Sequence, residues 1–384
     1  METPFPYSQH VSGKQFVGRT GDVTLLGNLL SQGEHVCLYE PPKSGKTSVI
    51  QQALFNMRLS GKAFSVGQIS ALNIHTPEAF LLRLGSTLLR TVASTPEEFA
   101  QLVGKYLDGT HFVFDPRTYA DGGQVLSLGW ELDKADVSAM LRLPFHLAAD
   151  RGERLILIVD EFHCLGQLPD PDVILRSLDA AMREYQGGRL FNYILCGSGV
   201  NAMKAIFESS LLFHRVVERV RLSPLGEQEL CDHMQRGFLT GGKVVNQDLI
   251  LGACRLLRGH PWYLNHFSAI CDSMSRGYIM EPVFVEALSS LVSVHQPRFV
   301  EMVTGLTTHQ VNLLQATLCG VTRFSAAEVI RQYGLNSSAN VKRVKDALMK
   351  KEILLFDESD TPTFQDPLFE YWLKKYYFEM ESAS

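Results

Sequence analysis

A short segment near the N-terminus combines residue types that bind phosphate. Its sequence is Glu40-Pro41-Pro42-Lys43-Ser44-Gly45-Lys46-Thr47, and it follows a predicted strand and opens a predicted helix, Thr47 to Met57. Gly45 lets the backbone wrap closely around a phosphate, and the N–H groups at a helix N-terminus attract the same anion. Lys46 would place its charge on the β- and γ-phosphates, and the Thr47 hydroxyl would ligate Mg²⁺. The segment therefore predicts a site for ATP and Mg²⁺.

This segment departs from the P-loop pattern GxxxxGK[ST] at one position only. Glu40 stands where the pattern has its first glycine. A residue that precedes proline favours extended backbone, so Glu40 can occupy that position. We assign nucleotide binding to the whole loop and to the residue after it: Glu40, Pro41, Pro42, Lys43, Ser44, Gly45, Lys46, Thr47 and Ser48.

A second motif ends a fully apolar strand with two carboxylates. Leu155 to Val159 is followed directly by Asp160 and Glu161. In P-loop enzymes the first carboxylate holds the Mg²⁺ shell and a following acid polarises the attacking water. We therefore assign Asp160 to the metal and Glu161 to the catalytic base; the alternative is a pair that caps the next helix. His163 is expected at the start of that helix, facing solvent rather than binding metal.

Both motifs belong to an alternating pattern of strands and helices. The predicted strands are His35–Tyr39, Ala63–Ile69, Leu155–Val159, Phe191–Cys196 and Glu218–Leu222. A helix is expected from Asp22 to Leu30, with Val23, Leu26 and Leu30 on one face. Continuous apolar strands separated by helices indicate an α/β fold with a parallel sheet and helices on both faces. The stretch from Thr95 to Trp130 is less regular, is rich in Gly, Asp and aromatic residues, and could be an insertion. Residues 1–16 look like an irregular lead-in.

The pattern changes after residue 225. Four helices are expected at Glu227–Arg236, Gln247–Leu257, Trp262–Ser275 and Pro282–Leu291, without strands between them. Helices at Thr308–Leu318, Ala326–Tyr333 and Ser338–Lys350 then precede a short hairpin, which is the order of a winged helix. We predict a P-loop ATPase core at 1–225, an all-helical lid at 226–300 and a winged-helix domain at 301–384.

Composition limits the classes of function. The chain has 384 residues and a formal net charge of −5, which is no global nucleic-acid signature. No apolar run approaches the length of a membrane-spanning helix, and no secretory signal is visible at the N-terminus. The seven cysteines lack CxxC spacing, which indicates core packing in a reducing cytoplasm.

These motifs resemble those of archaeal-type P-loop ATPases of the STAND and AAA+ groups. Phe16-Val17-Gly18-Arg19 resembles a box that precedes the P-loop in that family, and Gly259-His260-Pro261 resembles the G-x-P turn of its lid. The resemblance implies that Pro261 lies near the nucleotide and that Ser198, after the next strand, senses the γ-phosphate. It also implies an arginine that reaches a γ-phosphate; Arg215 fits best, with Arg219 and Arg221 as alternatives.

The predicted function is a Mg²⁺-dependent ATPase that couples ATP binding and hydrolysis to a conformational switch, with turnover that could depend on a partner. The alternative is a DNA-binding regulator that keeps ATP as a structural ligand, since the helix Ser338–Lys350 and the residue after it carry Lys342, Arg343, Lys345, Lys350 and Lys351 against Asp346. That helix could contact duplex DNA, contact protein or be only solvated. Self-association, or a partner-sensing switch, also fits the resemblance.

Overall fold

The computed structural model describes residues 4–120 and 123–380, and the chain forms two compact units. The sheet unit comprises Thr20–Glu40 and Val49–Leu222. The helical unit comprises Met1–Arg19, Pro41–Ser48 and Ser223–Ser384. None of the helices in the described ranges is long and apolar enough to cross a membrane.

The sheet unit is built on five parallel strands. Their order is β2 (Phe64–Ser70), β5 (Arg154–Asp160), β6 (Phe191–Gly197), β1 (His35–Tyr39) and β7 (Val217–Arg219). The central strands β1, β5 and β6 are buried almost throughout, as expected when both faces of a parallel sheet are covered. The predicted parallel α/β fold is therefore confirmed, with every predicted strand present.

The last strand lies earlier than predicted. It was expected at Glu218–Leu222 but ends at Arg219, although the Val220 N–H still donates to the Cys37 carbonyl. The ladder stops there because the Leu222 N–H donates instead to the Glu40 carboxylate, at 3.3 Å. The Glu40 side chain thus accepts the hydrogen bond that a carbonyl of β1 would accept if the ladder continued. The periodicity of apolar residues gives no sign of such a contact.

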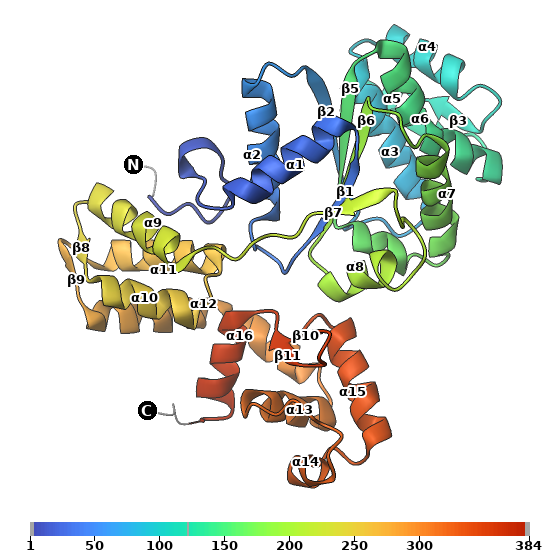
Figure 1. Cartoon of the computed structure of the whole chain (residues 1–384). Coiled ribbons are helices and arrows are strands. Elements are labelled where there is room, and N and C mark those ends of the chain that lie inside the picture. The colour runs from blue at the N-terminus through green and yellow to red at the C-terminus, as the bar shows by residue number, and fades with distance from the viewer. Residues whose placement is uncertain (1–3, 121–122, 381–384) are drawn as a thin grey trace. The chain divides into compact units, whose positions relative to one another are not determined.

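Helices cover both faces of the sheet (Figure 1). They are α1 (Thr20–Gln32), α2 (Lys46–Leu59), α3 (Pro77–Val92), α6 (Lys134–Arg151), α7 (Pro171–Glu184) and α8 (Val200–Phe207). In α1 the buried side chains include Val23, Leu26 and Leu30, the stripe that the sequence predicted. The carboxyl ends of β1, β5 and β6 lie at the same edge of the sheet because these strands are parallel, so Glu40, Asp160 and Ser198 follow strands at one edge.

The stretch from 95 to 130 is more regular than expected. It contains α4 (Pro96–Tyr106), α5 (Pro116–Ala120) and an antiparallel pair, β3 (Phe112–Phe114) with β4 (Leu126–Leu128). Thr95 and Glu98 form a capping box at the start of α4. The expectation of irregular structure was wrong here because it gave weight to glycine and aromatic content and overlooked the cap.

Four helices begin the part of the helical unit that follows Ser223. They are α9 (Glu227–Thr240), α10 (Gln247–Leu256), α11 (Pro261–Met274) and α12 (Glu281–Thr304). Two short parallel strands, β8 (Val244–Val245) and β9 (Tyr278–Ile279), were not expected between them. Helix α12 extends well beyond the predicted end at Leu291 and continues through Pro297, whose missing N–H removes only one hydrogen bond.

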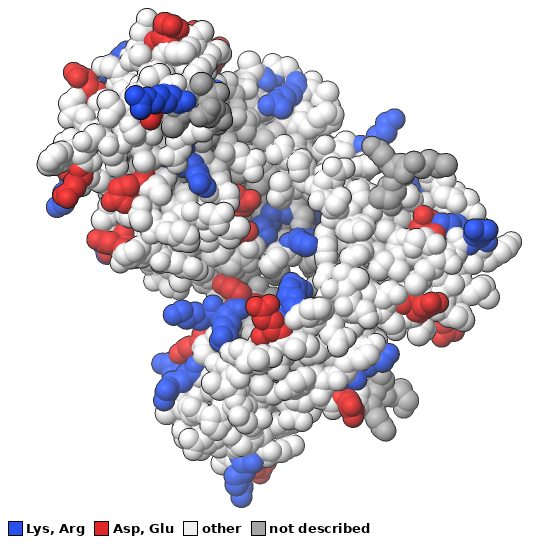
Figure 2. Space-filling model, turned by 180° about the vertical axis from the view of Figure 1, so that it is seen from behind, with Lys and Arg blue, Asp and Glu red and all other residues white. Residues whose placement is uncertain are grey.

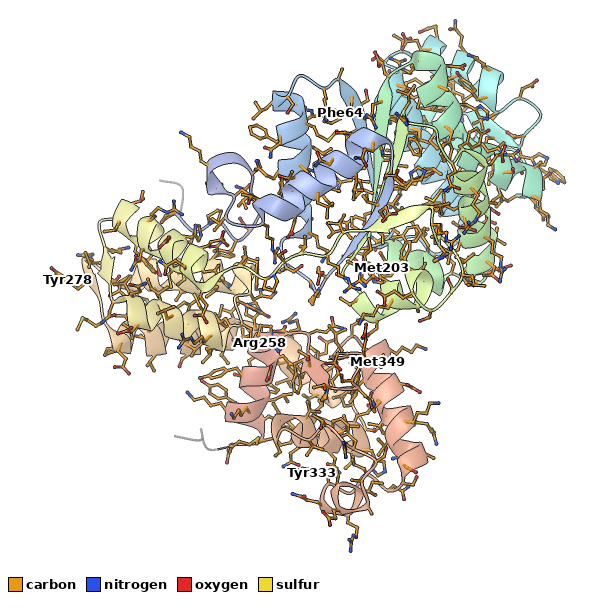
Figure 3. The ribbon with its side chains drawn as sticks, in the orientation of Figure 1. Phe64, Met203, Arg258, Tyr278, Tyr333 and Met349 are labelled. Carbon is orange, nitrogen blue, oxygen red and sulfur yellow. The ribbon has the colours of Figure 1, made fainter. Side chains whose placement is uncertain are left out.

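The remainder of the helical unit has the predicted winged-helix order. The elements are α13 (Thr308–Leu318), α14 (Ala327–Gln332), α15 (Ser338–Lys350), the antiparallel strands β10 (Leu354–Phe356) and β11 (Pro362–Phe364), and α16 (Pro367–Trp372), followed by a π-helical turn at Leu373–Tyr377. Arg258, labelled in Figure 3, donates to the Phe364 carbonyl at 2.5 Å and pairs with Glu370 at 3.2 Å. The chain between α10 and α11 is thereby tied to β11 and α16.

Candidate nucleotide site

The loop between β1 and α2 has the backbone that a phosphate cradle needs. Gly45 has φ of +100°, a conformation that other residues rarely adopt. A Cβ atom there would lie 3.0 Å from Nη1 of Arg19. Lys46 is buried, and its Nζ donates to the Pro41 carbonyl at 3.0 Å. The ammonium group is therefore folded back over the loop, where a phosphate would meet it.

Arg19 joins this loop by hydrogen bonds to the segment that precedes α9. Its Nη1 donates to the Ser44 carbonyl at 2.6 Å and its Nε to the Ser223 carbonyl at 2.8 Å. Gly18 has φ of +64°, and a Cβ atom there would lie 2.7 Å from Leu225. Gly18 and Arg19 end the segment whose sequence resembles the box that precedes the P-loop in the family. The structure adds its physical role, which is to join the loop to the chain that enters α9.

The turn Gly259-His260-Pro261 contacts the same loop. Nδ1 of His260 accepts the Tyr263 N–H at 3.4 Å as the N-cap of α11, and Nε2 faces the Pro42 carbonyl at 3.2 Å. This pairing requires a neutral ring with its proton on Nε2. Burial lowers the pKa of His260 to about 4, which favours that neutral form. Pro261 is the first residue of α11, and its Cγ lies 4.0 Å from the Cβ position built at Gly45.

The N-terminal segment, residues 5–11, ties the loop to the helices of the same unit. Phe5 is fully buried, with its ring centroid 4.7 Å from that of Phe238. The Pro6 carbonyl accepts from Asn265 at 3.0 Å and the Tyr7 carbonyl from the Trp262 indole at 2.6 Å. At the other end, the Val11 N–H donates to the Ser48 hydroxyl at 3.1 Å. The sequence signal that could have revealed this role was the cluster of Phe5 and Tyr7 within an otherwise irregular lead-in.

These parts enclose a cavity of about 630 Å³. Residues 7–11 form one wall, P-loop residues 43 and 45–48 another, and α11 residues 261, 262 and 265 a third. A volume of this size falls within the range of small-molecule and cofactor sites. The predicted binding residues Lys43, Gly45, Lys46, Thr47, Ser48 and Pro261 all line it.

The two carboxylates of the sheet unit are held by the end of the neighbouring strand. Oδ1 of Asp160 accepts from the Glu161 N–H at 3.0 Å and lies 3.4 Å from Sγ of Cys196. Glu161 has φ of +52°, and its carboxylate accepts from the Ser198 hydroxyl, at 2.9 and 2.8 Å, and from the Ser198 N–H at 2.9 Å. The three predicted residues Asp160, Glu161 and Ser198 are thus brought together.

His163 does not face solvent, contrary to the sequence expectation. Its side chain is 13% exposed, and Nδ1 lies 3.3 Å from Oε2 of Glu161. The ring packs on Gly197 and Gly199, where added Cβ atoms would come within 3.0 and 2.7 Å of it. The expectation was wrong because it placed the histidine on an isolated helix start, without the glycines that make room for it.

Arg215 lies on an anchored turn before β7. Phe213 and Arg215 both have φ of +62°, and the turn is fixed to α7 by hydrogen bonds from Arg183 to the His214 carbonyl (3.1 Å) and from Gln186 to the Arg215 carbonyl (3.0 Å). The Arg215 side chain is exposed. Arg219, one of the alternatives, lies over the Tyr39 ring at 4.1 Å and pairs with Glu208, so it serves the packing of β7.

The comparisons with known proteins agree with this architecture. Residues 297–375 match the family model described as a probable winged helix domain. No curated protein matches the chain by sequence.

Two solved structures share the fold over nearly the whole chain. A Walker-type ATPase of Pyrococcus abyssi is 18% identical, with a TM-score of 0.69 over 97% of this chain and 100% of that one. The ORC2 protein of Aeropyrum pernix, solved as ADPNP and ADP complexes, is 14% identical, with a TM-score of 0.61 over 95% of this chain and 93% of that one. The chain therefore has the fold of a P-loop ATPase followed by helical segments and a winged helix.

Proposed function

We propose that this protein binds ATP with Mg²⁺ and hydrolyses it, using the nucleotide to drive a conformational switch of the AAA+ or STAND kind. The observation that carries the proposal is the cavity beside the P-loop, into which Lys46 and the start of α2 face. The residues present suit ATP: a loop glycine with positive φ, a buried lysine and the N-terminus of a helix form an anion cradle.

The remaining wall of the cavity suits a nucleobase. Tyr7, His10 and Trp262 supply ring faces or edges, and Val11 and Pro261 supply apolar surface. The backbone groups of residues 7–11 would be close enough to read the edge of a base. We assign base recognition to this segment, which the sequence left without a role.

Thr47 and Asp160 would hold Mg²⁺, and the ion would neutralise charge on the phosphates. Glu161 would accept the proton of the attacking water, and Ser198 would set the direction of its carboxylate. Arg215, exposed on its anchored turn, would stabilise negative charge on the γ-phosphate of a neighbouring copy. Because Arg215 would act on the site of a neighbouring copy, we expect turnover that a partner can raise.

The test is Mg²⁺-dependent ATP hydrolysis together with ATP binding by calorimetry. Glu161→Gln should bind ATP and lose hydrolysis by a factor of about 100 or more. Lys46→Ala should lose binding, whereas Lys134→Ala, which changes an exposed lysine at the start of α6, should behave as wild type. Unchanged turnover in Lys46→Ala would refute the assignment, and binding without hydrolysis in wild type would favour a structural role for ATP.

A second candidate function is DNA binding through α15. Lys342, Arg343, Lys350 and Lys351 are exposed on or directly after this helix, whereas Lys345 is taken up by Asp360 and the Phe356 ring. Figure 2 shows Lys and Arg side chains grouped over one flank of the winged-helix segment. In a helix-turn-helix arrangement this helix occupies the position of the recognition helix.

This candidate is tested by fluorescence anisotropy with duplex DNA at several salt concentrations. Lys342→Glu/Arg343→Glu should weaken binding and reduce its salt dependence by about two counterions. Lys374→Glu/Lys375→Glu makes the same charge change on the π-helical turn and should have little effect. The absence of binding at low salt, with and without ATP, would remove DNA from the account.

A further inference from the structure

Glu161 and His163 form a contact that the proposed function does not use. Both residues follow β5, and Nδ1 of His163 lies 3.3 Å from Oε2 of Glu161. Their side chains are largely withdrawn from solvent, with 22% of Glu161 and 13% of His163 exposed. Water screens a contact between partly buried groups less than a contact at the surface. The histidine is therefore able to act on the carboxylate that we assign to the catalytic base.

The His163 ring has little freedom to turn away from this carboxylate. A Cβ atom added at Gly197 would lie 3.0 Å from Nδ1 of the ring, and one added at Gly199 would lie 2.7 Å from Cδ2. Ser198, between the two glycines, donates its hydroxyl and its N–H to the same carboxylate. The Glu161 carboxylate is thus contacted by the end of β6 and also by a residue of its own segment.

A neighbouring thiol indicates which nitrogen of His163 carries the proton. Sγ of Cys164 lies 3.9 Å from Nε2 of His163. Burial, together with the charge of Glu161, raises the pKa of Cys164, so this thiol keeps its hydrogen near pH 7. The S–H group is a donor toward Nε2, which leaves the proton of a neutral ring on Nδ1. The Nδ1–H group then faces Oε2 of Glu161.

The contact between Nδ1 and Oε2 is long for a hydrogen bond. Its length of 3.3 Å exceeds the usual N–H···O distance by about 0.4 Å. Nδ1 is buried and has no hydrogen-bond partner in residues 4–120 and 123–380. Catalytic hydrogen bonds are often long in a free enzyme and shorten when substrate is bound. A small rotation of the Glu161 side chain would close the contact and give the buried N–H group a partner.

The donors around Glu161 would leave one of its lone pairs for a water molecule. A carboxylate has about four lone-pair positions, two on each oxygen. On Oε2 these positions would be taken by the Ser198 N–H and by Nδ1 of His163. The Ser198 hydroxyl has a single hydrogen and lies within 2.9 Å of both oxygens, so it would then donate to Oε1. The second lone pair of Oε1 remains for the proton of the attacking water.

We propose that His163 is a positioning residue for ATP hydrolysis, donating from Nδ1 to Oε2 of Glu161 so that Oε1 receives the proton of the water. The inference rests on the proposed function, because it gives a partner to the base assigned there. In that step the water gives its proton to Oε1 and its oxygen bonds to the γ-phosphorus. The bond from this phosphorus to the β–γ bridging oxygen breaks, and ADP leaves. His163 acts through Glu161 rather than on the substrate.

Two substitutions separate the donor from a ring that only fills space. His163→Asn keeps an N–H donor near the position of Nδ1, whereas His163→Leu keeps apolar volume without a donor. Packing alone favours leucine, because asparagine is smaller and polar. A positioning role predicts the opposite order. Turnover at saturating ATP should fall about tenfold in His163→Leu, the effect of losing one charge-assisted hydrogen bond, and stay within about threefold of wild type in His163→Asn.

Binding and folding are measured on the same variants. ADP affinity, measured by calorimetry, should stay within about twofold of wild type in both variants, because His163 acts on the base and not on nucleotide binding. Circular dichroism and thermal unfolding establish that each variant is folded. His146→Leu, on the exposed side of α6, is the control for the loss of a histidine and should not change turnover.

A second measurement needs neither turnover nor a folded His163→Leu variant. In wild-type protein labelled with ¹⁵N-histidine, nuclear magnetic resonance shows which ring nitrogen carries the proton. The spectrum is recorded at pH 8, where an ordinary imidazole is neutral. The signals of His163 are identified by their absence from the spectrum of His163→Asn. We expect the proton on Nδ1.

The outcomes separate this inference from the proposed function. The inference alone is overturned if Nδ1 carries no proton, or if wild type hydrolyses ATP and His163→Leu is at least as active as His163→Asn. If wild type binds ATP without hydrolysing it, the assignment of Glu161 as the base fails, and the role of His163 fails with it.

Discussion

Ser198 donates its hydroxyl to both carboxylate oxygens of Glu161, at 2.9 and 2.8 Å, and its N–H to one of them at 2.9 Å. The contact is possible because β5 and β6 are adjacent parallel strands, with Val159 opposite Leu195. The residues that follow these strands therefore meet at one edge of the sheet. The polar end of β6 thus controls where the carboxylate at the end of β5 points.

Removing this hydroxyl should slow hydrolysis without preventing binding. Ser198→Ala deletes the side-chain hydrogen bonds to Glu161, and we expect turnover to fall about tenfold, the effect of losing one charge-assisted hydrogen bond. ATP affinity should stay within about twofold, a change of less than one kcal/mol. Steady-state hydrolysis and calorimetry measure the two quantities, with Ser209→Ala as an exposed control. A higher turnover in Ser198→Ala would show instead that Ser198 restrains the base.

The N-terminal segment should contribute to stability and to nucleotide affinity together. Phe5→Ala removes a fully buried ring and should cost about 3 kcal/mol of unfolding free energy in the helical unit. ATP affinity should fall as well, since Tyr7 and Val11 would lose their anchor. Urea unfolding and calorimetry are the measurements. Tyr278→Ala, at a side chain that is 76% exposed and projects outward in Figure 3, should change stability by less than about 0.5 kcal/mol.

His260 should make the turn before α11 sensitive to acid. Its folded pKa, about 4, is lower than the ordinary value of 6.5, chiefly because of burial. The unfolded chain therefore binds more protons between these values, and stability is full above pH 6.5 and lost as pH falls toward 4. Protonation would place a hydrogen on Nδ1, opposite the Tyr263 N–H that it caps.

His260→Asn is the matched variant for this effect, because asparagine can cap the helix but does not titrate. The unfolding free energy is measured at pH 7 and at pH 5 for both proteins. Its decrease from pH 7 to pH 5 should be about 1 kcal/mol larger in wild type than in the variant, after allowance for partial solvent exposure. Equal losses in the two proteins would show that His260 does not contribute. His75→Asn, on an exposed loop, serves as a control for the loss of a histidine.

Arg215 should act only when copies of the chain meet. Its turn is anchored to α7 while its side chain is exposed, so hydrolysis per molecule should rise with protein concentration. Arg215→Ala should lower turnover at high concentration by a factor of about 1,000, as for other arginines that supply charge to phosphoryl transfer. If turnover of the wild type does not depend on protein concentration, and Arg215→Ala does not change it, Arg215 is an exposed surface residue without a role in hydrolysis.

The parts of the fold that follow from periodicity were predictable. The buried strands of the sheet, the stripe of α1 and the order of the winged helix each depend on local patterns of apolar residues. The phosphate loop was recognisable because its chemistry lies within eight consecutive residues. The domain boundaries at 225 and 300 and the roles of Arg215 and Ser198 stay predictions.

The parts that depend on distant contacts were not predictable. Arg19 braces a loop 25 residues away, Phe5 packs on α9, and His163 occupies space left by Gly197 and Gly199. Each of these is a pairing of single residues that no repeating pattern marks. A cavity of about 290 Å³ within the helical unit is of the same kind, since its lining residues come from the P-loop, the start of α11, α12 and the winged-helix segment.

Helix α12 has a mechanical consequence. It is one rod of 24 residues, about 36 Å long at 1.5 Å per residue, and the match to the winged-helix family begins within it at residue 297. The segment that contacts the P-loop and the segment that carries α15 are therefore joined by a stiff element rather than by a flexible linker. A tilt of about 10° at one end of such a rod moves the other by about 6 Å. A small tilt of α12 beside the nucleotide would therefore displace the winged helix by several times the distance moved at the nucleotide end.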